Sequence, residues 1–207
     1  KLIATISGGE TFEWDSDPIT ANNTRATLLP NAPTSSAFSL VSTPDRHLIF
    51  FGTETTIGTK STKDEMFIRF SSQEDINTYT PTSTNTAGTQ RLADGSKIMG
   101  AIRGRDAIYV WTDTALFIMR FVGAPFTFSF QQVGTNCGLI GKNAAVEVDG
   151  SAYWMSENGF FRYTGKLESL ACLVEDHVYD DINTIPKQHI NVGLNNLFGE
   201  VMWFYPN

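Results

Sequence analysis

Short apolar stretches separated by polar turns follow one another along almost the whole chain, and helical periodicity is nearly absent. Residues 2–6 and 11–14 flank a Ser-Gly-Gly-Glu segment, a pattern typical of a β-hairpin. The same pattern predicts further strands at residues 47–51, 66–70, 107–111, 115–121, 126–131, 144–148, 151–155, 160–163 and 200–204. Only residues 170–182 favour a helix, and even that stretch contains several β-forming residues.

Glycine-containing turns and polar connections punctuate this pattern. Asp149-Gly150 and Asn158-Gly159 supply the positive φ angles that tight hairpin turns require. Residues 78–94 form a polar tract expected to be a loop or crossing segment, and residues 22–36 form a similar connection containing prolines. The chain is therefore predicted to be all-β.

A weak internal repeat links several of the predicted strands. Aromatic strands beginning near residues 47, 107, 152 and 201 recur at intervals of 60, 45 and 49 residues. Intervals of roughly 40 to 50 residues that carry four short strands are typical of β-propeller blades. We therefore expect β-propeller-like blades of short antiparallel strands, with a β-sandwich as the alternative.

Composition narrows the class of protein. The 207 residues are 41% hydrophobic and 12% aromatic, which excludes a disordered chain. The longest apolar runs fall far short of the roughly 20 residues of a membrane span, so no span is expected. A net charge of −7 argues against a surface that grips phosphates. Cys137 and Cys172 belong to no metal or redox motif, and two buried thiols are the favoured interpretation.

No catalytic constellation is apparent. The only histidines, His47, His177 and His189, lie in no metal-binding spacing, and nucleophile-elbow and phosphate-loop motifs are absent. We therefore predict no catalytic residues, no cofactor, no metal and no enzymatic activity. Three acidic pairs are the candidates for glycosidase carboxylates, but a solvated face or a turn cap is favoured for each of them: Glu74/Asp75, Glu175/Asp176 and Asp180/Asp181.

Residues 72–79 resemble a degenerate Asp-box, the hairpin turn of sialidase-type propellers in which an acidic group caps the turn's own backbone. Glu74 occupies the position of the acidic residue, Ile76 that of the glycine and Tyr79 that of the tryptophan. Such a turn is structural and supports a blade rather than an enzyme. The many Tyr and Trp rings favour core packing over sugar stacking. A glycan-binding host-recognition propeller, and less favoured a sialidase-like hydrolase, are kept as alternatives.

An ordered series of segments gives the chain a resemblance to a known family. The series comprises residues 46–52, 67–75, 79–81, 84–88, 95–98, 110–116, 136–141, 153–161, 180–183 and 200–206. In this order, over roughly residues 45–207, they are similar to the central region of tailed-bacteriophage tail tube, hub or nozzle proteins, which are also labelled tail tubular or DNA-stabilisation proteins.

The resemblance implies a structural virion protein with propeller-like β domains. Members assemble as homo-oligomeric rings, commonly hexamers, below the portal, where they contact portal or adaptor and other tail proteins. They are assembled in the host cytoplasm, and the genome passes through the ring with transient, non-specific contact. Family members are several times longer than this chain. We therefore expect residues 1–207 to be an internal fragment, with a hairpin and connection at 1–44 and a propeller-like region at 45–207.

The charge is distributed unevenly along the chain. Residues 47–141 carry eight basic and eight acidic side chains, whereas residues 142–207 carry four basic and nine acidic ones. Lys and Arg contacts to phosphates would slow the passage of DNA, whereas acidic groups would repel it. The hypothesis that follows is that part of this acidic region, Glu168, Glu175 and Asp176, faces the lumen of the ring.

Overall fold

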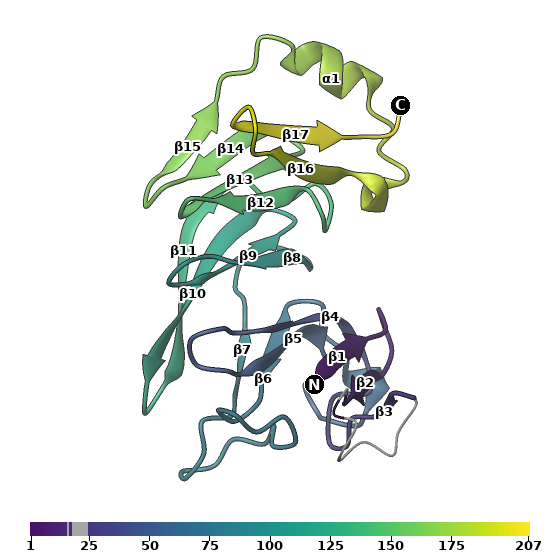
Figure 1. The fold of residues 1–207 in the computed structure, drawn as a ribbon, viewed down its shortest axis with the longest axis vertical. Coiled ribbons are helices and arrows are strands. Elements are labelled where there is room, and N and C mark those ends of the chain that lie inside the picture. The colour runs from purple at the N-terminus through teal and green to yellow at the C-terminus, as the bar shows by residue number, and fades with distance from the viewer. Residues whose placement is uncertain (16, 18–24) are drawn as a thin grey trace. The chain divides into compact units, whose positions relative to one another are not determined.

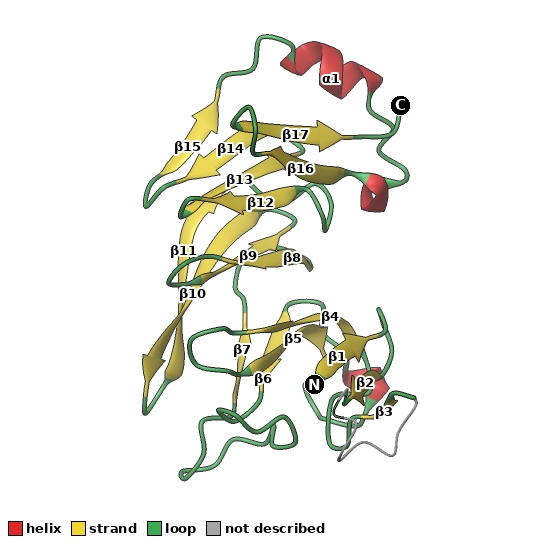
Figure 2. Ribbon diagram, in the orientation of Figure 1, coloured by secondary structure: helices red, strands yellow, loops and turns green. Residues whose placement is uncertain are grey.

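The computed structural model describes residues 1–15, 17 and 25–207. The described part of the protein is mostly β, as the sequence predicts, with 48% of its residues in strands and one short α-helix (Figures 1 and 2). The chain divides into two compact units. Unit 1 comprises residues 1–93 with 122–127, and unit 2 comprises residues 94–121 with 128–207.

Unit 1 contains two antiparallel sheets. The smaller has the strand order β1-β2-β3, formed by Leu2–Thr5, Thr11–Trp14 and Thr27–Leu28. The larger has the order β4-β5-β6-β7, formed by Ser36–Val41, Leu48–Thr53, Phe67–Phe70 and Gly88–Arg91, with a short 3₁₀ turn at Lys60–Thr62. The hairpin expected around the Ser-Gly-Gly-Glu segment is confirmed, because β1 pairs with β2 from Leu2–Trp14 to Thr5–Thr11.

Unit 2 contains most of one four-stranded sheet, a second complete one and a two-stranded pair. The first sheet consists of β8 to β11, formed by Ile98–Arg103, Ile108–Thr112, Ala115–Gly123 and Thr127–Thr135. The second consists of β12 to β15, formed by Ala145–Val148, Ser151–Ser156, Gly159–Tyr163 and Leu167–Leu170. After α1 (Glu175–Asp181) and a 3₁₀ turn (Lys187–His189), β16 and β17 form a hairpin at Asn191–Asn195 and Glu200–Phe204.

Turn chemistry explains why successive strands pair. Asp149 and Gly150, between β12 and β13, have φ angles of 51° and 85°. Two consecutive positive φ angles match the right-handed twist of the flanking strands, as the Asp-Gly dipeptide predicts. Gly159, the first residue of β14, has a φ of 121°, a backbone conformation that residues other than glycine rarely adopt. These turns hold Val148 opposite Ser151 and Ser156 opposite Gly159.

The aromatic repeat falls on equivalent strands. The strands expected near residues 47, 107, 152 and 201 are β5, β9, β13 and β17, and each is the second strand of its sheet or hairpin. Within unit 2 the first strands also correspond, since β12 contacts both β8 and β16. The backbone N–H of Val192, in β16, donates to the carbonyl of Asn143, just before β12, at 3.0 Å. Each sheet of this unit therefore contacts the next through its first strand.

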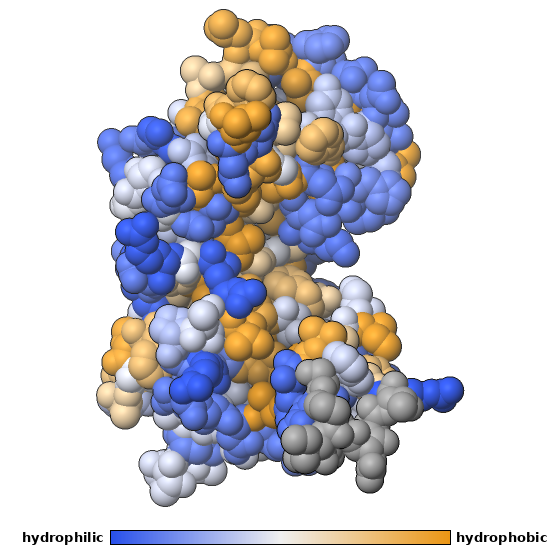
Figure 3. Space-filling model, in the orientation of Figure 1, coloured by the Kyte–Doolittle hydropathy of each residue, from blue (hydrophilic) through white to orange (hydrophobic). Residues whose placement is uncertain are grey.

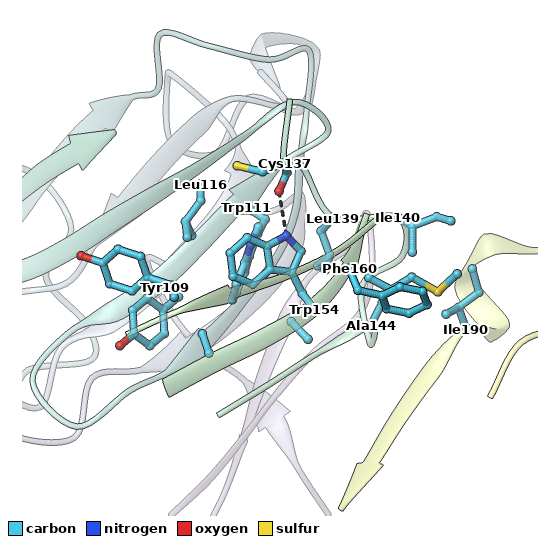
Figure 4. Close-up of a cluster of buried hydrophobic side chains, with 14 of the residues drawn as sticks. Tyr109, Trp111, Leu116, Cys137, Leu139, Ile140, Ala144, Trp154, Phe160 and Ile190 are labelled. Atoms are coloured by element: carbon cyan, nitrogen blue, oxygen red, sulfur yellow. Dashed lines mark hydrogen bonds between the residues drawn. The ribbon is translucent and has the colours of Figure 1, made fainter. Parts of the chain in front are cut away.

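A tryptophan-centred core joins the sheets of unit 2. Trp111 on β9 and Trp154 on β13 are fully buried, with ring centroids 5.3 Å apart. The indole N–H of Trp154 donates to the carbonyl of Cys137 at 2.7 Å (Figure 4). The ring of Trp154 also stacks on that of Phe161, with centroids 5.7 Å apart. Phe160 meets Trp203 of β17 at 5.1 Å, which extends the core to the last hairpin.

Several elements differ from the sequence-based prediction. Every expected strand overlaps an observed one, but β3, β4, β7, β8, β15 and β16 were not expected. The helix expected at 170–182 is confined to α1, and part of the connection expected at 22–36 lies outside the described residues. The first division between the compact units falls after residue 93, and β4 pairs with β5 within unit 1. Cys137 is buried as expected, whereas Cys172 is half-buried, and both thiols are free.

Candidate functional site

The three acidic residues proposed to face DNA lie on two elements of unit 2. Glu168 is on β15 and pairs across the sheet with Arg162, whose Nε donates to the carboxylate at 3.1 Å. Arg162 lowers the pKa of Glu168 through this hydrogen bond and through its charge. Glu175 and Asp176 form the first turn of α1, and Glu175 lies against the turn at Gly159. Glu168 is therefore partly neutralised by a neighbour within its own sheet.

The turn that resembles an Asp-box is held by a different residue from the one the sequence indicated. Asp75, not Glu74, caps it: the Asp75 carboxylate accepts the backbone N–H of Asn77 at 2.9 Å and bonds the Thr78 side chain. These hydrogen bonds lower the pKa of Asp75. Glu74 has a positive φ of 58° and forms an ion pair with Arg46 instead. Both carboxylates of this acidic pair therefore have structural partners.

A buried Asp–His–Thr chain lies beside this turn. Nδ1 of His47 is 2.8 Å from the carboxylate of Asp45, which also accepts the hydroxyl of Ser42. Nε2 of His47 is 3.1 Å from the hydroxyl of Thr86, and that oxygen accepts the N–H of Gln73 at 2.7 Å. The order of groups is that of a hydroxyl nucleophile with its base. However, His47 is completely buried and the Thr86 oxygen already accepts a backbone N–H. This series of hydrogen bonds therefore connects loops and has a structural role.

We expect His47 to make unit 1 sensitive to mild acid. Burial lowers the pKa of His47 below its ordinary value, an effect that Asp45 opposes only in part. The unfolded chain therefore binds a proton near pH 6.5 that the folded protein resists, and stability falls as the pH is lowered through that region. Urea unfolding should show a lower midpoint at pH 5.5 than at pH 7.5.

Exposed histidines provide the control for this pH dependence. His47→Gln should flatten the change in midpoint between pH 7.5 and 5.5, whereas His177→Gln, on the outside of α1, should leave it intact. An equal pH dependence in the His47→Gln variant would show that another group is responsible.

Among the described residues, no group of three or more His, Cys, Asp or Glu side chains is placed to hold a metal ion.

One small cavity in unit 1 lies among three loops, and we call it the asparagine–threonine pocket. Its volume is about 480 Å³, within the range of roughly 300 to 1,000 Å³ of small-molecule sites. Three loops line it, with Asn31, Ala32, Thr34, Ile57, Gly58, Asn77, Thr78, Tyr79 and Thr80. From the sequence, two of these loops are predicted only as polar connections. Their meeting at a pocket is not predicted, because the residues involved are separated by up to 49 positions.

Two buried charged side chains form hydrogen bonds with the loops that line this pocket. The carboxylate of Glu54 accepts the hydroxyl of Thr34 and, at 2.7 Å, the N–H of Gly58. The guanidinium of Arg69 donates to the carbonyls of Thr55 at 2.8 Å and Tyr79 at 3.3 Å. Glu54 is fully buried and Arg69 is 5% exposed. Burial lowers the pKa of Arg69, and the charge of Glu54 opposes this shift.

A second cavity, of about 580 Å³, lies near the first and shares Asn77 with it. Its floor is apolar, with Ile3, Leu48 and Ile76, and its rim carries charges of both signs. Those charges have partners: Arg46 pairs with Glu74, and Lys1 pairs with Glu13 at 3.1 Å. The charged side chains of this rim are therefore less available to a ligand than the polar groups of the asparagine–threonine pocket.

No known protein family matches the sequence, and no curated protein matches it. Among the helices that the structure describes, none has the length and apolar character that crossing a membrane requires.

Proposed function

We propose that this chain is a structural segment of a tail nozzle or hub protein of a tailed bacteriophage, located below the portal complex. One observation carries the proposal furthest: unit 2 builds a continuous core from successive sheets that meet through equivalent strands. In repeat architectures each unit packs on its neighbours in this way. The segments that resemble tail proteins supply much of this core, including Trp111, Trp154, Phe160 and Trp203.

The proposed architecture of the region is propeller-like. Each four-stranded sheet is a simple meander of strands consecutive in the sequence, the topology of a blade. The contacts of β12 with β8 and β16 support this arrangement, because the first strands of neighbouring blades adjoin each other in a propeller. The capped turn around Asp75 in unit 1 supports it too, as a blade turn of the Asp-box kind.

The β16–β17 hairpin fits the proposed repeat of sheets. It corresponds to the first two strands of the preceding sheets, and in the structure it is a two-stranded sheet. Met202 and Phe204 share its outer face and are 38% and 59% exposed. Figure 3 shows apolar surface (orange) around the turn that joins β16 and β17.

The proposed role is to form a ring, of six copies in the family, that docks to portal or adaptor and other tail proteins and guides or retains DNA. In this proposal Glu168, Glu175 and Asp176 face the lumen and repel the phosphates of passing DNA. Contact with the genome is transient and non-specific, and the protein is a virion component rather than an enzyme.

Cryo-electron microscopy of virions produced from the genome that encodes this chain tests the proposal. The expected result is a ring below the portal whose density fits the sheets of both units. Absence of the protein from purified particles, or its location away from the tail, would overturn the function. A ring with all three acidic residues on its outer wall would instead overturn only the proposed role of those residues.

A further inference from the structure

The walls of the asparagine–threonine pocket are polar but uncharged. Two asparagines and three threonines line it, and none of its lining residues is Lys, Arg, Asp, Glu or His. The accessible apolar part of the wall comes from Ile57 and Ala32, because Tyr79 is only 2% exposed. A wall of this kind neither attracts an ion nor suits a wholly apolar ligand.

The hydrogen-bonding groups on the rim are placed for a ligand rich in hydroxyls. Asn31 is held at a φ of 62°, and its amide donates to the backbone carbonyl of Asn77 at 3.3 Å. The side chains of Asn77 and Thr80 make no hydrogen bond to the described part of the chain, and both residues are exposed. An amide offers donors and an acceptor together, which matches a hydroxyl that both donates and accepts.

The charged groups behind the wall make the pocket a preformed one. Glu54 fixes Thr34 and Gly58, and Arg69 fixes the carbonyl of Tyr79, so all three loops are held by hydrogen bonds to buried charges. Burying opposite charges is a poor route to stability, since apolar side chains of similar volume often serve as well or better. Buried charges do hold geometry, and a ligand loses less affinity when its site is fixed beforehand.

From these three observations we infer that the asparagine–threonine pocket binds one uncharged sugar residue. Ring hydroxyls exchange hydrogen bonds with the amide of Asn77 and the hydroxyl of Thr80. The C–H face of the sugar lies against Ile57 and Ala32, the accessible apolar part of the wall. This inference does not depend on the virion role, since it rests on unit 1 alone.

Saturation-transfer NMR on the 207-residue chain tests the inference. The probes are the methyl glycosides of glucose, galactose, mannose and N-acetylglucosamine, with methyl glucuronide as the anionic counterpart. At least one neutral glycoside should give a saturable signal and the glucuronide should not. Binding of the glucuronide alone, or of no glycoside, would overturn the inference.

A pair of asparagine variants places the ligand. Asn77→Ala should weaken binding of the neutral glycoside by at least about tenfold while leaving the fold intact, because Asn77 is exposed. Asn158→Ala, an equally exposed asparagine in a turn of unit 2, should leave the affinity unchanged. Equal affinity in the Asn77→Ala variant and the unmodified chain would show that the sugar binds elsewhere.

Glu54→Gln tests whether the groups behind the wall set its geometry. The amide has nearly the shape of the carboxylate but can accept fewer hydrogen bonds and adds a donor facing Thr34 and Gly58. We expect a shifted Gly58 amide resonance in the free protein and at least a fivefold loss of sugar affinity. An unchanged affinity together with a shifted resonance would show that the wall does not position the ligand.

Discussion

Trp154→Ala should destabilise the protein by about 3 to 5 kcal/mol, the range for removing a large aromatic side chain from a packed core. Trp154 is fully buried between the rings of Trp111 and Phe161, at centroid distances of 5.3 and 5.7 Å. The substitution leaves a cavity and also deprives the carbonyl of Cys137 of its donor. Urea unfolding followed by circular dichroism measures the loss.

The two buried tryptophans allow a matched comparison. In the described structure Trp111 has no hydrogen-bond partner for its indole N–H, whereas Trp154 bonds Cys137. Trp154→Phe should therefore cost about 1 to 2 kcal/mol more than Trp111→Phe, although both changes remove the same atoms. Trp14→Ala, at a site 39% exposed, should cost far less than Trp154→Ala. A cost below about 1 kcal/mol for Trp154→Ala would contradict its place in the core and favour a ligand-stacking role.

Arg69→Met should also cost about 3 to 5 kcal/mol, in this case through electrostatics and lost hydrogen bonds. Methionine retains much of the side-chain volume but provides no donors. The carbonyls of Glu54, Thr55 and Tyr79 would lose their hydrogen bonds to the guanidinium. The buried carboxylate of Glu54 would also lose the opposite charge that accompanies it. Chemical unfolding of the purified variant measures the loss.

Arg91→Met is the control for this substitution. Arg91 lies on the neighbouring strand β7, opposite Phe67, and its ion pair with Asp64 at 2.7 Å is exposed to solvent. Loss of an exposed ion pair costs at most about 1 kcal/mol. If Arg69→Met and Arg91→Met were equally mild, the charge behind the asparagine–threonine pocket would not be a structural element of unit 1.

The sequence predicts best the strands that carry aromatic residues. β5, β9, β13 and β17 were expected because bulky apolar side chains at consecutive positions mark buried strands. The strand β7, with sequence Gly-Thr-Gln-Arg, was expected as loop, because its side chains are mainly exposed and polar. It forms because β6 offers it an unpaired edge, and that pairing is decided by the fold rather than by local composition.

The prediction of sites from the sequence was limited in the same way, because local composition does not determine which residues come together. Capping by an acidic residue was predicted for the turn at residues 72–79, but the choice between Glu74 and Asp75 depended on backbone angles that the pattern does not encode. The asparagine–threonine pocket could not be predicted, because its three loops carry ordinary turn residues. The clearest sequence indication of this pocket is the presence of Glu54 and Arg69 within or next to apolar strands, where charged residues are unusual. The groups that these buried side chains contact are known only from the structure.

The meander topology has a consequence for how the polypeptide acquires its structure during synthesis. Each four-stranded sheet pairs strands that are consecutive in the sequence, and in the sheets β8–β11 and β12–β15 the connecting loops have only two to four residues. Short loops close quickly, which favours rapid formation of each sheet once it has left the ribosome. We expect β8 to β11 to provide a preformed surface on which β12 to β15 condense. The order of folding would then follow the order of translation, from one sheet to the next.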